Sequence, residues 1–104
     1  MTQLLSAKPL RDVLSRLTGW TGDTHGISRT LQLTDGAHAE LLERVKVCAD
    51  ALNHYPRIER VGSRTKVLLR TVVAGGVTDA DIRLAARIDG IVARITGHSA
   101  ATGA

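Results

Sequence analysis

The 104-residue sequence contains no phenylalanine, and Trp20 and Tyr55 are its only aromatic residues. A domain of this length buries only about 60–70% of the surface that its unfolded chain exposes. Its interior must therefore be a modest core of Leu, Ile, Val and Ala, to which an oligomer interface would add burial. A pair of stacking aromatic side chains, a common device for binding nucleic acid, is also missing.

Cysteine is equally scarce, because Cys48 is alone and no disulfide can form within the chain. Cys48 lies in an apolar helical pattern, and we expect it to be a small buried side chain. The four histidines do not make metal-ligand spacing with one another or with Cys48, so we expect no metal and no cofactor. These histidines are His25, His38, His54 and His98.

Long apolar runs are absent, and none approaches the roughly 20 residues of a membrane-spanning helix. Residues 1–10 also lack the basic start and apolar stretch of a secretory signal. We therefore expect a cytoplasmic protein that does not contact a membrane. The net charge is +4, with a pI near 10.0, which mildly favours an anionic partner.

The first half of the chain contains a short helix, a hairpin and a long helix. The first helix is predicted from Pro9 to Leu17 by an apolar stripe. Trp20 begins a strand-like segment, and the alternation of residues 27–33 predicts a half-buried second strand. Arg29 interrupts the apolar face of that strand. A helix capped by Thr34 or Asp35 then runs to about residue 53 with a period of 3.6 residues.

The second half repeats the pattern of hairpin and helix. Strands are predicted at 58–61 and 65–73, joined by a tight turn. On the second of them, Lys66, Leu68, Arg70 and Val72 share one face. Thr78 caps the last helix, with Asp81 three residues on as in a capping box, and that helix runs to about residue 96.

The predicted fold is therefore α+β, in the order helix, strand, strand, helix, strand, strand, helix. Two hairpins with few crossovers predict a four-stranded antiparallel sheet with three helices on one face. The other face is left for water, a ligand or a second subunit. We assign residues 1–96 to a single domain and residues 97–104 to a flexible tail.

The segment Asn53-His54-Tyr55-Pro56, followed by the segment from Gly75 to Ala85, carries a resemblance to a known family. Pterin-4a-carbinolamine dehydratases have His-His-Pro between the long helix and the third strand, a third histidine after the fourth strand, and then a Gly-Gly-Leu-Thr-like turn and an Asp. The sequence resembles this family over nearly its whole length, with no gap needed between Pro56 and Asp81. The resemblance implies the same fold.

Two of the three family histidines are replaced in this sequence. The first is matched by His54, whereas Tyr55 and Val72 stand where the resemblance places the second and third. Expelling hydroxide from a pterin carbinolamine needs an acid and a base, roles that suit histidine because its pKa is near neutral. Tyr is a poor base at neutral pH and Val transfers no proton. His54, Tyr55, Val72 and Asp81 are thus interpreted as a vestigial site, with no catalytic residue and no pterin binding expected.

The second hairpin is rich in cations. Five of them occur within fourteen residues, against a single acid, Glu59. Together with apolar neighbours they form the predicted partner-binding set, which comprises Arg57, Arg60, Arg64, Lys66, Leu68, Arg70 and Val72. A protein partner suits a face that is apolar in its middle and cationic around it. The equally weighted alternative is a solvated strand edge protected against aggregation. Nucleic acid is not expected, because no helix-turn-helix pattern or zinc-ligand set accompanies the charge.

Three functions follow from this pattern. The preferred one is a non-catalytic binding protein, because one branch of the family that has lost these histidines acts as RuBisCO assembly factors (chaperones) encoded with α-carboxysomes. The resemblance then implies the RuBisCO large subunit as partner, a carboxysome-associated location and a homodimer with sheets paired edge to edge. The alternatives are a weakly active dehydratase that uses His54 and a transcriptional co-regulator, the latter by analogy with other relatives.

Overall fold

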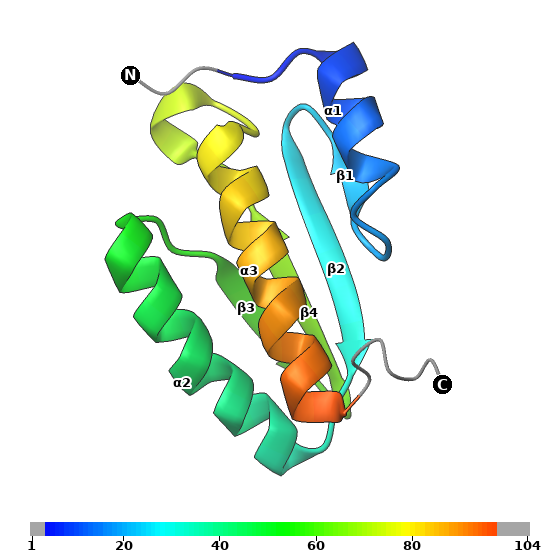
Figure 1. The fold of residues 1–104 in the computed structure, drawn as a ribbon, viewed down its shortest axis with the longest axis vertical. Coiled ribbons are helices and arrows are strands. Elements are labelled where there is room, and N and C mark those ends of the chain that lie inside the picture. Colours follow the sequence, from blue (N-terminus) through cyan, green and yellow to red (C-terminus); the bar gives the residue numbers. More distant parts are fainter. Residues whose placement is uncertain (1–3, 98–104) are drawn as a thin grey trace.

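The computed structural model describes residues 4–97 as three helices over one sheet, with a short 3₁₀ helix before the last of them (Figure 1). The elements follow in the order α1 (Ala7–Leu14), β1 (Thr21–Asp23), β2 (Gly26–Gln32), α2 (Asp35–Leu52), β3 (Arg57–Val61), β4 (Arg64–Leu69), η1 (Val72–Ala74) and α3 (Asp79–Thr96). The predicted tail beyond Gly97 lies outside the described residues. In the described part of the chain, no helix is long and apolar enough to cross a membrane.

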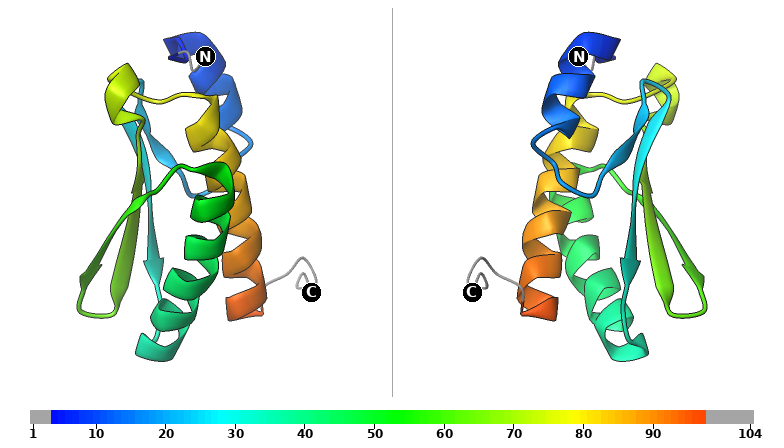
Figure 2. Two further views of the ribbon diagram at one scale, coloured as in Figure 1. Left: turned by 90° about the vertical axis from the view of Figure 1, so that its left-hand side faces the viewer. Right: turned by 90° about the vertical axis from the view of Figure 1, so that its right-hand side faces the viewer.

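The sheet has the strand order β1-β2-β4-β3, and every neighbouring pair is antiparallel. Figure 2 shows the strands as one layer and the helices as a second layer on one side of them. The predicted α+β fold with three helices on one face is therefore confirmed. The opposite face of the sheet, called here the outer face, is not covered by any helix of the described residues.

Local signals fix the ends of the two long helices. The Thr34 side chain accepts a hydrogen bond from the backbone N–H of Ala37, as an N-cap does. Asn53 ends α2 with a left-handed backbone, which asparagine tolerates better than most residues. Thr78 and Asp81 form a capping box at the start of α3. Both long helices thus begin and end close to their predicted positions.

The prediction was wrong at the ends of two elements. α1 begins at Ala7 and ends at Leu14, so Pro9 lies within its first turn, where a missing N–H costs nothing. β4 ends at Leu69 rather than at residue 73. The N–H of Thr71 bonds to the carbonyl of Gly76, and this closes the η1 turn and ends the strand. Val72 therefore does not continue the face of Lys66 and Leu68.

An aliphatic core fills the space between the two layers, as the lack of phenylalanine requires. The sheet contributes its inward residues, among them Ile27, Leu31, Val67 and Leu69, and α3 contributes Leu84 and Ile88. All of these are less than 10% exposed. Cys48 is only half-buried and packs at the rim of this core, so its predicted burial is partly correct.

The structure explains Arg29, the cation on the apolar face of β2. Its Nη1 donates to Asp89 Oδ1 on α3 at 2.5 Å, and the indole Nε1 of Trp20 donates to the same oxygen at 2.8 Å. The ion pair is about three-quarters buried. Trp20 is 3% exposed, so Asp89 both balances a cation and satisfies an indole N–H that water cannot reach.

Candidate functional site

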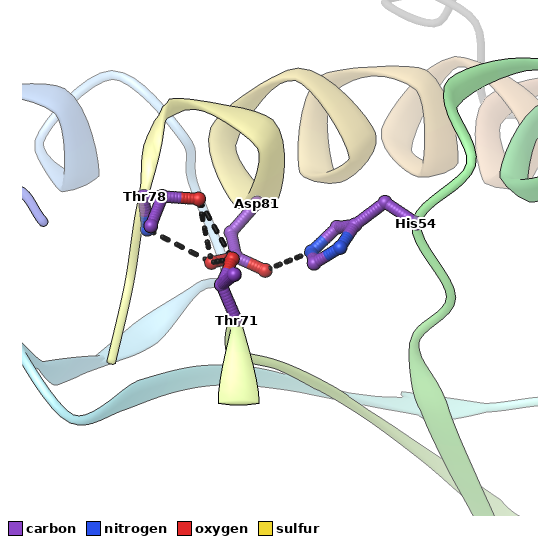
Figure 3. A network of polar contacts seen from close by, with 4 residues as sticks. All are labelled: His54, Thr71, Thr78 and Asp81. Atoms are coloured by element: carbon purple, nitrogen blue, oxygen red, sulfur yellow. Dashed lines mark hydrogen bonds and ion pairs between the residues drawn. The ribbon is translucent and has the colours of Figure 1, made fainter. Parts of the chain in front are cut away.

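The candidate site lies where the end of α2, the segment after β4 and the first turn of α3 meet. His54 follows the left-handed Asn53, and its backbone N–H donates to the carbonyl of Ala49 at 3.0 Å. This C-terminal cap fixes the direction in which the chain leaves α2. The imidazole is thereby held against the start of α3 (Figure 3).

Asp81 is the centre of the site, and its side chain is completely buried. One carboxylate oxygen, Oδ1, lies 2.5 Å from His54 Nε2. The other, Oδ2, accepts hydrogen bonds from the Thr71 hydroxyl at 2.9 Å, from the Thr78 backbone N–H at 2.8 Å and from the Thr78 hydroxyl at 3.4 Å. Figure 3 shows these groups converging on the carboxylate, so its burial is matched by hydrogen bonds.

The hydrogen bonds determine the proton positions on His54. An ionised carboxylate only accepts hydrogen bonds, so Nε2 must carry the proton that faces Asp81. Nδ1 is then the atom able to take up or release a proton, as an acid or base requires. The His54 side chain keeps 13% of its surface exposed. The His54–Asp81 pair thus has the form of an oriented acid–base group.

Tyr55 does not join this pair. Its side chain is exposed, and its hydroxyl donates to Asp50 Oδ1 on α2. The hydrogen bond to Asp50, with smaller contributions from burial and from the negative charge, raises the pKa of Tyr55 above its usual value of 10.0. The same bond, reinforced by Lys46, lowers the pKa of Asp50. A phenol with a raised pKa stays protonated at neutral pH and cannot act as a base there.

The Asp50 interaction is testable because Tyr55 is the single tyrosine of the chain. We expect an ultraviolet titration of tyrosinate to give a pKa above 10.0 in the native protein, and Asp50→Asn to bring it back toward that of a free tyrosine. Since the folded-state pKa is raised, the stabilisation is present below the unfolded value and is lost as the pH rises through the folded value. Glu43→Gln, which also removes an exposed acid from α2, serves as the control and should leave the titration unchanged.

Val72 is likewise unable to complete the site. It lies in η1, is 76% exposed, and directly follows Thr71, whose hydroxyl bonds to Asp81. This segment is fixed in place because Gly76 packs against the β1–β2 turn, where a Cβ would come within 2.2 Å of the Thr24 carbonyl oxygen. Position 72 is therefore held beside the network, but by a side chain with no proton to transfer.

The predicted partner-binding residues do not share one face. The guanidinium of Arg60 turns toward the helix layer, where it donates to Thr65 Oγ1 at 2.9 Å and to Asp35 Oδ1 at 2.8 Å. Arg64, Lys66 and Leu68 alternate with the buried residues of β4 and so face outward. In the sheet register, Arg57 is paired with Leu68, while the exposed Arg70 follows the end of the strand. We call the outward set of Arg57, Arg64, Lys66, Leu68 and Arg70 the outer basic face. Arg60 and Val72 lie apart from it.

Sequence reasoning missed Thr71 and Thr78 as site residues. Thr78 was identified only as a helix cap, and Thr71 was not singled out. A threonine at the end of an inward-facing apolar row, opposite a capping aspartate, is the signal that would have found them. In residues 4–97 no group of three or more His, Cys, Asp or Glu side chains is placed to hold a metal ion.

Comparison with known proteins agrees with the architecture and the motif. Residues 3–91 match the family model described as pterin 4 alpha carbinolamine dehydratase. A protein of Bradyrhizobium sp. strain ORS 278, described as a candidate pterin-4-alpha-carbinolamine dehydratase, is 37% identical over 93% of this chain and 100% of its own length. A protein of Sulfurisphaera tokodaii with the same description is 35% identical over 82% of this chain and 92% of its own.

A solved structure resembles the whole fold. It is described as a transcriptional coactivator/pterin dehydratase from Brucella melitensis, and it superposes with a TM-score of 0.79 at 25% identity. The superposition covers 85% of this chain and 97% of the other. With a family match over most of its length and relatives above one-third identity, the chain belongs to the pterin-4a-carbinolamine dehydratase family.

Proposed function

We propose that this family member has lost efficient dehydratase chemistry and acts as a non-catalytic binding protein. The observation that carries the proposal is the chemistry at positions 55 and 72. Tyr55 donates its hydroxyl to Asp50 and Val72 is an exposed aliphatic side chain. His54 is then the one imidazole beside Asp81, and a dehydration that needs both an acid and a base lacks a second group among the described residues.

The proposed client is the RuBisCO large subunit, in line with the resemblance to the family branch that lost the same histidines. The outer basic face supports binding to an acidic or polar protein surface. Arg64 and Lys66 are exposed there, and Leu68 lies between them and Arg70 as a half-buried apolar contact. Apolar contact surrounded by arginine is a combination enriched at protein interfaces. The proposed location is the cytoplasm, in association with the carboxysome.

The proposal includes a homodimer. β1 and β3 are the two edges of the sheet, and an unpaired edge is a template for association. Val61 on β3 is 76% exposed, and pairing this edge with a second copy would bury it. Such a dimer would place two outer basic faces on one continuous sheet and double the surface offered to a client.

A weakly active dehydratase is the second candidate, and the His54–Asp81 pair is the observation that favours it. The carboxylate fixes the orientation of the imidazole, as in other positioned histidines. A single positioned acid or base is worth about 10²–10⁴-fold in rate. Carbinolamine dehydration that is abolished by His54→Ala, without any effect of the protein on RuBisCO assembly, would favour this candidate over the first.

Reversing charge on the outer basic face should separate client binding from folding. Lys66→Glu with Arg70→Glu is the informative pair, because both side chains are exposed, whereas Arg60 is engaged with Asp35. We expect the double variant to fold normally and to weaken client binding by several kcal/mol if the pairs are buried in the complex. The measurement is the yield of assembled α-carboxysomal RuBisCO on co-expression.

Arg11→Glu with Arg16→Glu is the matched control, because it changes the charge equally at exposed positions that are not part of the outer basic face. Wild type and control should raise the RuBisCO yield above that without the protein, and the face variant should not. If all three raise it equally, the outer face is not the client site. If none raises it, the assembly role itself is wrong.

A further inference from the structure

A second cationic surface lies in the helix layer, away from both His54 and the outer face of the sheet. A groove of about 350 Å³ is lined by residues of both α2 and α3, the two helices that run side by side in opposite directions in Figure 1. We call it the α2–α3 groove. Its lining residues are Arg44, Cys48, Arg87, Gly90, Ile91 and Arg94.

The charge of this groove is not balanced within the described residues. Arg44 forms an ion pair with Glu40 at 2.9 Å, while Arg87 and Arg94 form none with any residue from 4 to 97. The nearest acid along α3, Asp89, is already paired with Arg29 on β2. Three guanidinium groups therefore face one carboxylate, and an anionic ligand would complete the set.

The middle of the groove is apolar and open. Cys48 and Ile91 are half-buried at its floor. Gly90 lies in the interior of α3, where glycine costs roughly 0.5–1 kcal/mol relative to alanine. A Cβ at Gly90 would meet no atom within 4 Å, so packing inside the chain does not require glycine there. Its missing side chain instead leaves space for one from outside.

The spacing of these residues matches a helix. Arg87, Gly90, Ile91 and Arg94 fall at i, i+3, i+4 and i+7, which places them on one face of α3. The two arginines are two turns apart, about 10 Å along the axis, on either side of the open position. We propose that the α2–α3 groove binds an acidic amphipathic helix of a partner protein. One apolar side chain enters over Gly90, and flanking carboxylates pair with Arg87 and Arg94.

Charge complementarity favours such a partner over other occupants. A single phosphate would pair with the arginines but leave the apolar floor uncovered. A second copy of this chain carries the same net charge of +4, and two of the acids on its α2, Glu40 and Asp50, are already paired with Arg44 and Lys46. The groove is separate from the outer basic face, so this inference does not depend on the proposed function.

The test uses a labelled helix-forming peptide as the probe. It has two glutamates spaced as Arg87 and Arg94 are, a leucine midway between them and alanine elsewhere. Fluorescence anisotropy should show saturable binding to the full chain that weakens with salt. Arg87→Glu with Arg94→Glu should weaken it by about tenfold or more, whereas the Arg11→Glu with Arg16→Glu control should leave it unchanged.

A second test fills the space over Gly90 without changing any charge. Gly90→Leu should also reduce peptide binding by about tenfold, while a better helix former keeps the fold stable. Gly36→Leu, at another open helical glycine, should have no effect on binding. The proposal is overturned by equal binding of a peptide with glutamine in place of glutamate, or by no binding at all. If a uridine oligonucleotide bound more tightly than the peptide, the groove would be assigned to RNA and the proposal would be wrong. If the groove variants lost self-association, the groove would be assigned to a second copy, which would also overturn the proposal.

Discussion

Replacing Asp81 by alanine is expected to lower the free energy of unfolding by several kcal/mol, because each buried donor left without an acceptor costs about 1–3 kcal/mol. Asp81 is fully buried and accepts from His54, Thr71 and Thr78. Without its carboxylate, the backbone N–H of Thr78 loses its acceptor in a place that water does not reach, and the Thr71 hydroxyl keeps only its contact with the Thr78 hydroxyl. Domains of this size are stable by only about 5–15 kcal/mol, so the loss is a large fraction of the total.

Denaturant unfolding followed by the fluorescence of Trp20, the single tryptophan, measures this loss. Asp79→Ala is the matched control, because Asp79 lies in the same first turn but is 67% exposed in its pair with Arg83. That control should change stability by no more than about 1 kcal/mol. Asp81→Asn should be intermediate, since its amide can still donate to a His54 whose proton moves to Nδ1. Equal losses for Asp79→Ala and Asp81→Ala would show that the network does not hold the site together.

The hydrogen bonds around Asp81 differ in how well the sequence could predict them. The capping box of Thr78 and Asp81 was predicted, because it depends on residues three apart in one turn. The approach of His54 to the same carboxylate bridges 27 residues. Only the family resemblance, which grouped His54 and Asp81 in one vestigial site, pointed to it. It depends on the exact end of α2, where the left-handed Asn53 redirects the chain. Local chemistry therefore predicted the cap, but not its second use as the acceptor for a histidine.

β4 illustrates a limit of periodicity. Val67, Leu69 and Thr71 keep the inward alternation to the last residue, and the apolar Val72 and Val73 led to the prediction of a longer strand. The structure ends the strand at Leu69 because the N–H of Thr71 bonds to Gly76 five residues later. Both valines are then more than 75% exposed. Side-chain type cannot reveal where a backbone N–H changes partner, so the face assigned to Val72 was wrong.

The partners of Arg29 and Arg60 could not be predicted from the sequence. Each was read as a cation on a strand, and each is paired with an acid far away in the sequence, Asp89 and Asp35 respectively. Alternation correctly placed Arg29 on the inward face but offered no partner for it. For Arg60 the cluster of neighbouring cations suggested a common surface that the strand pleat divides. Which cations remain available to a partner is therefore a property of the tertiary structure.

Restoring histidines at the two substituted positions should raise dehydratase activity by about 10²-fold or more, since each positioned acid or base is worth about that much. Tyr55 directly follows His54, and Val72 directly follows Thr71, so both changes place an imidazole next to a member of the Asp81 network. Both positions are exposed, at 57% and 76%, so Tyr55→His with Val72→His creates no overpacking and should fold. The measurement is the rate of pterin carbinolamine dehydration, compared with the wild type and with the uncatalysed reaction.

Three further results are expected if proton transfer limits the reaction at this site. The wild type should lie near the uncatalysed rate, because His54 has no second acid–base group beside it. Tyr55→His with Val73→His, which adds the same two side chains but places one on the neighbouring, 96% exposed position of η1, should gain less. His54→Ala should then remove the gain from the restored variant, because the imidazole oriented by Asp81 is the part of the site that the chain has kept. A wild-type rate already equal to that of the restored variant would mean that Tyr55 and Val72 do not limit the chemistry, and the chain would then be an active dehydratase.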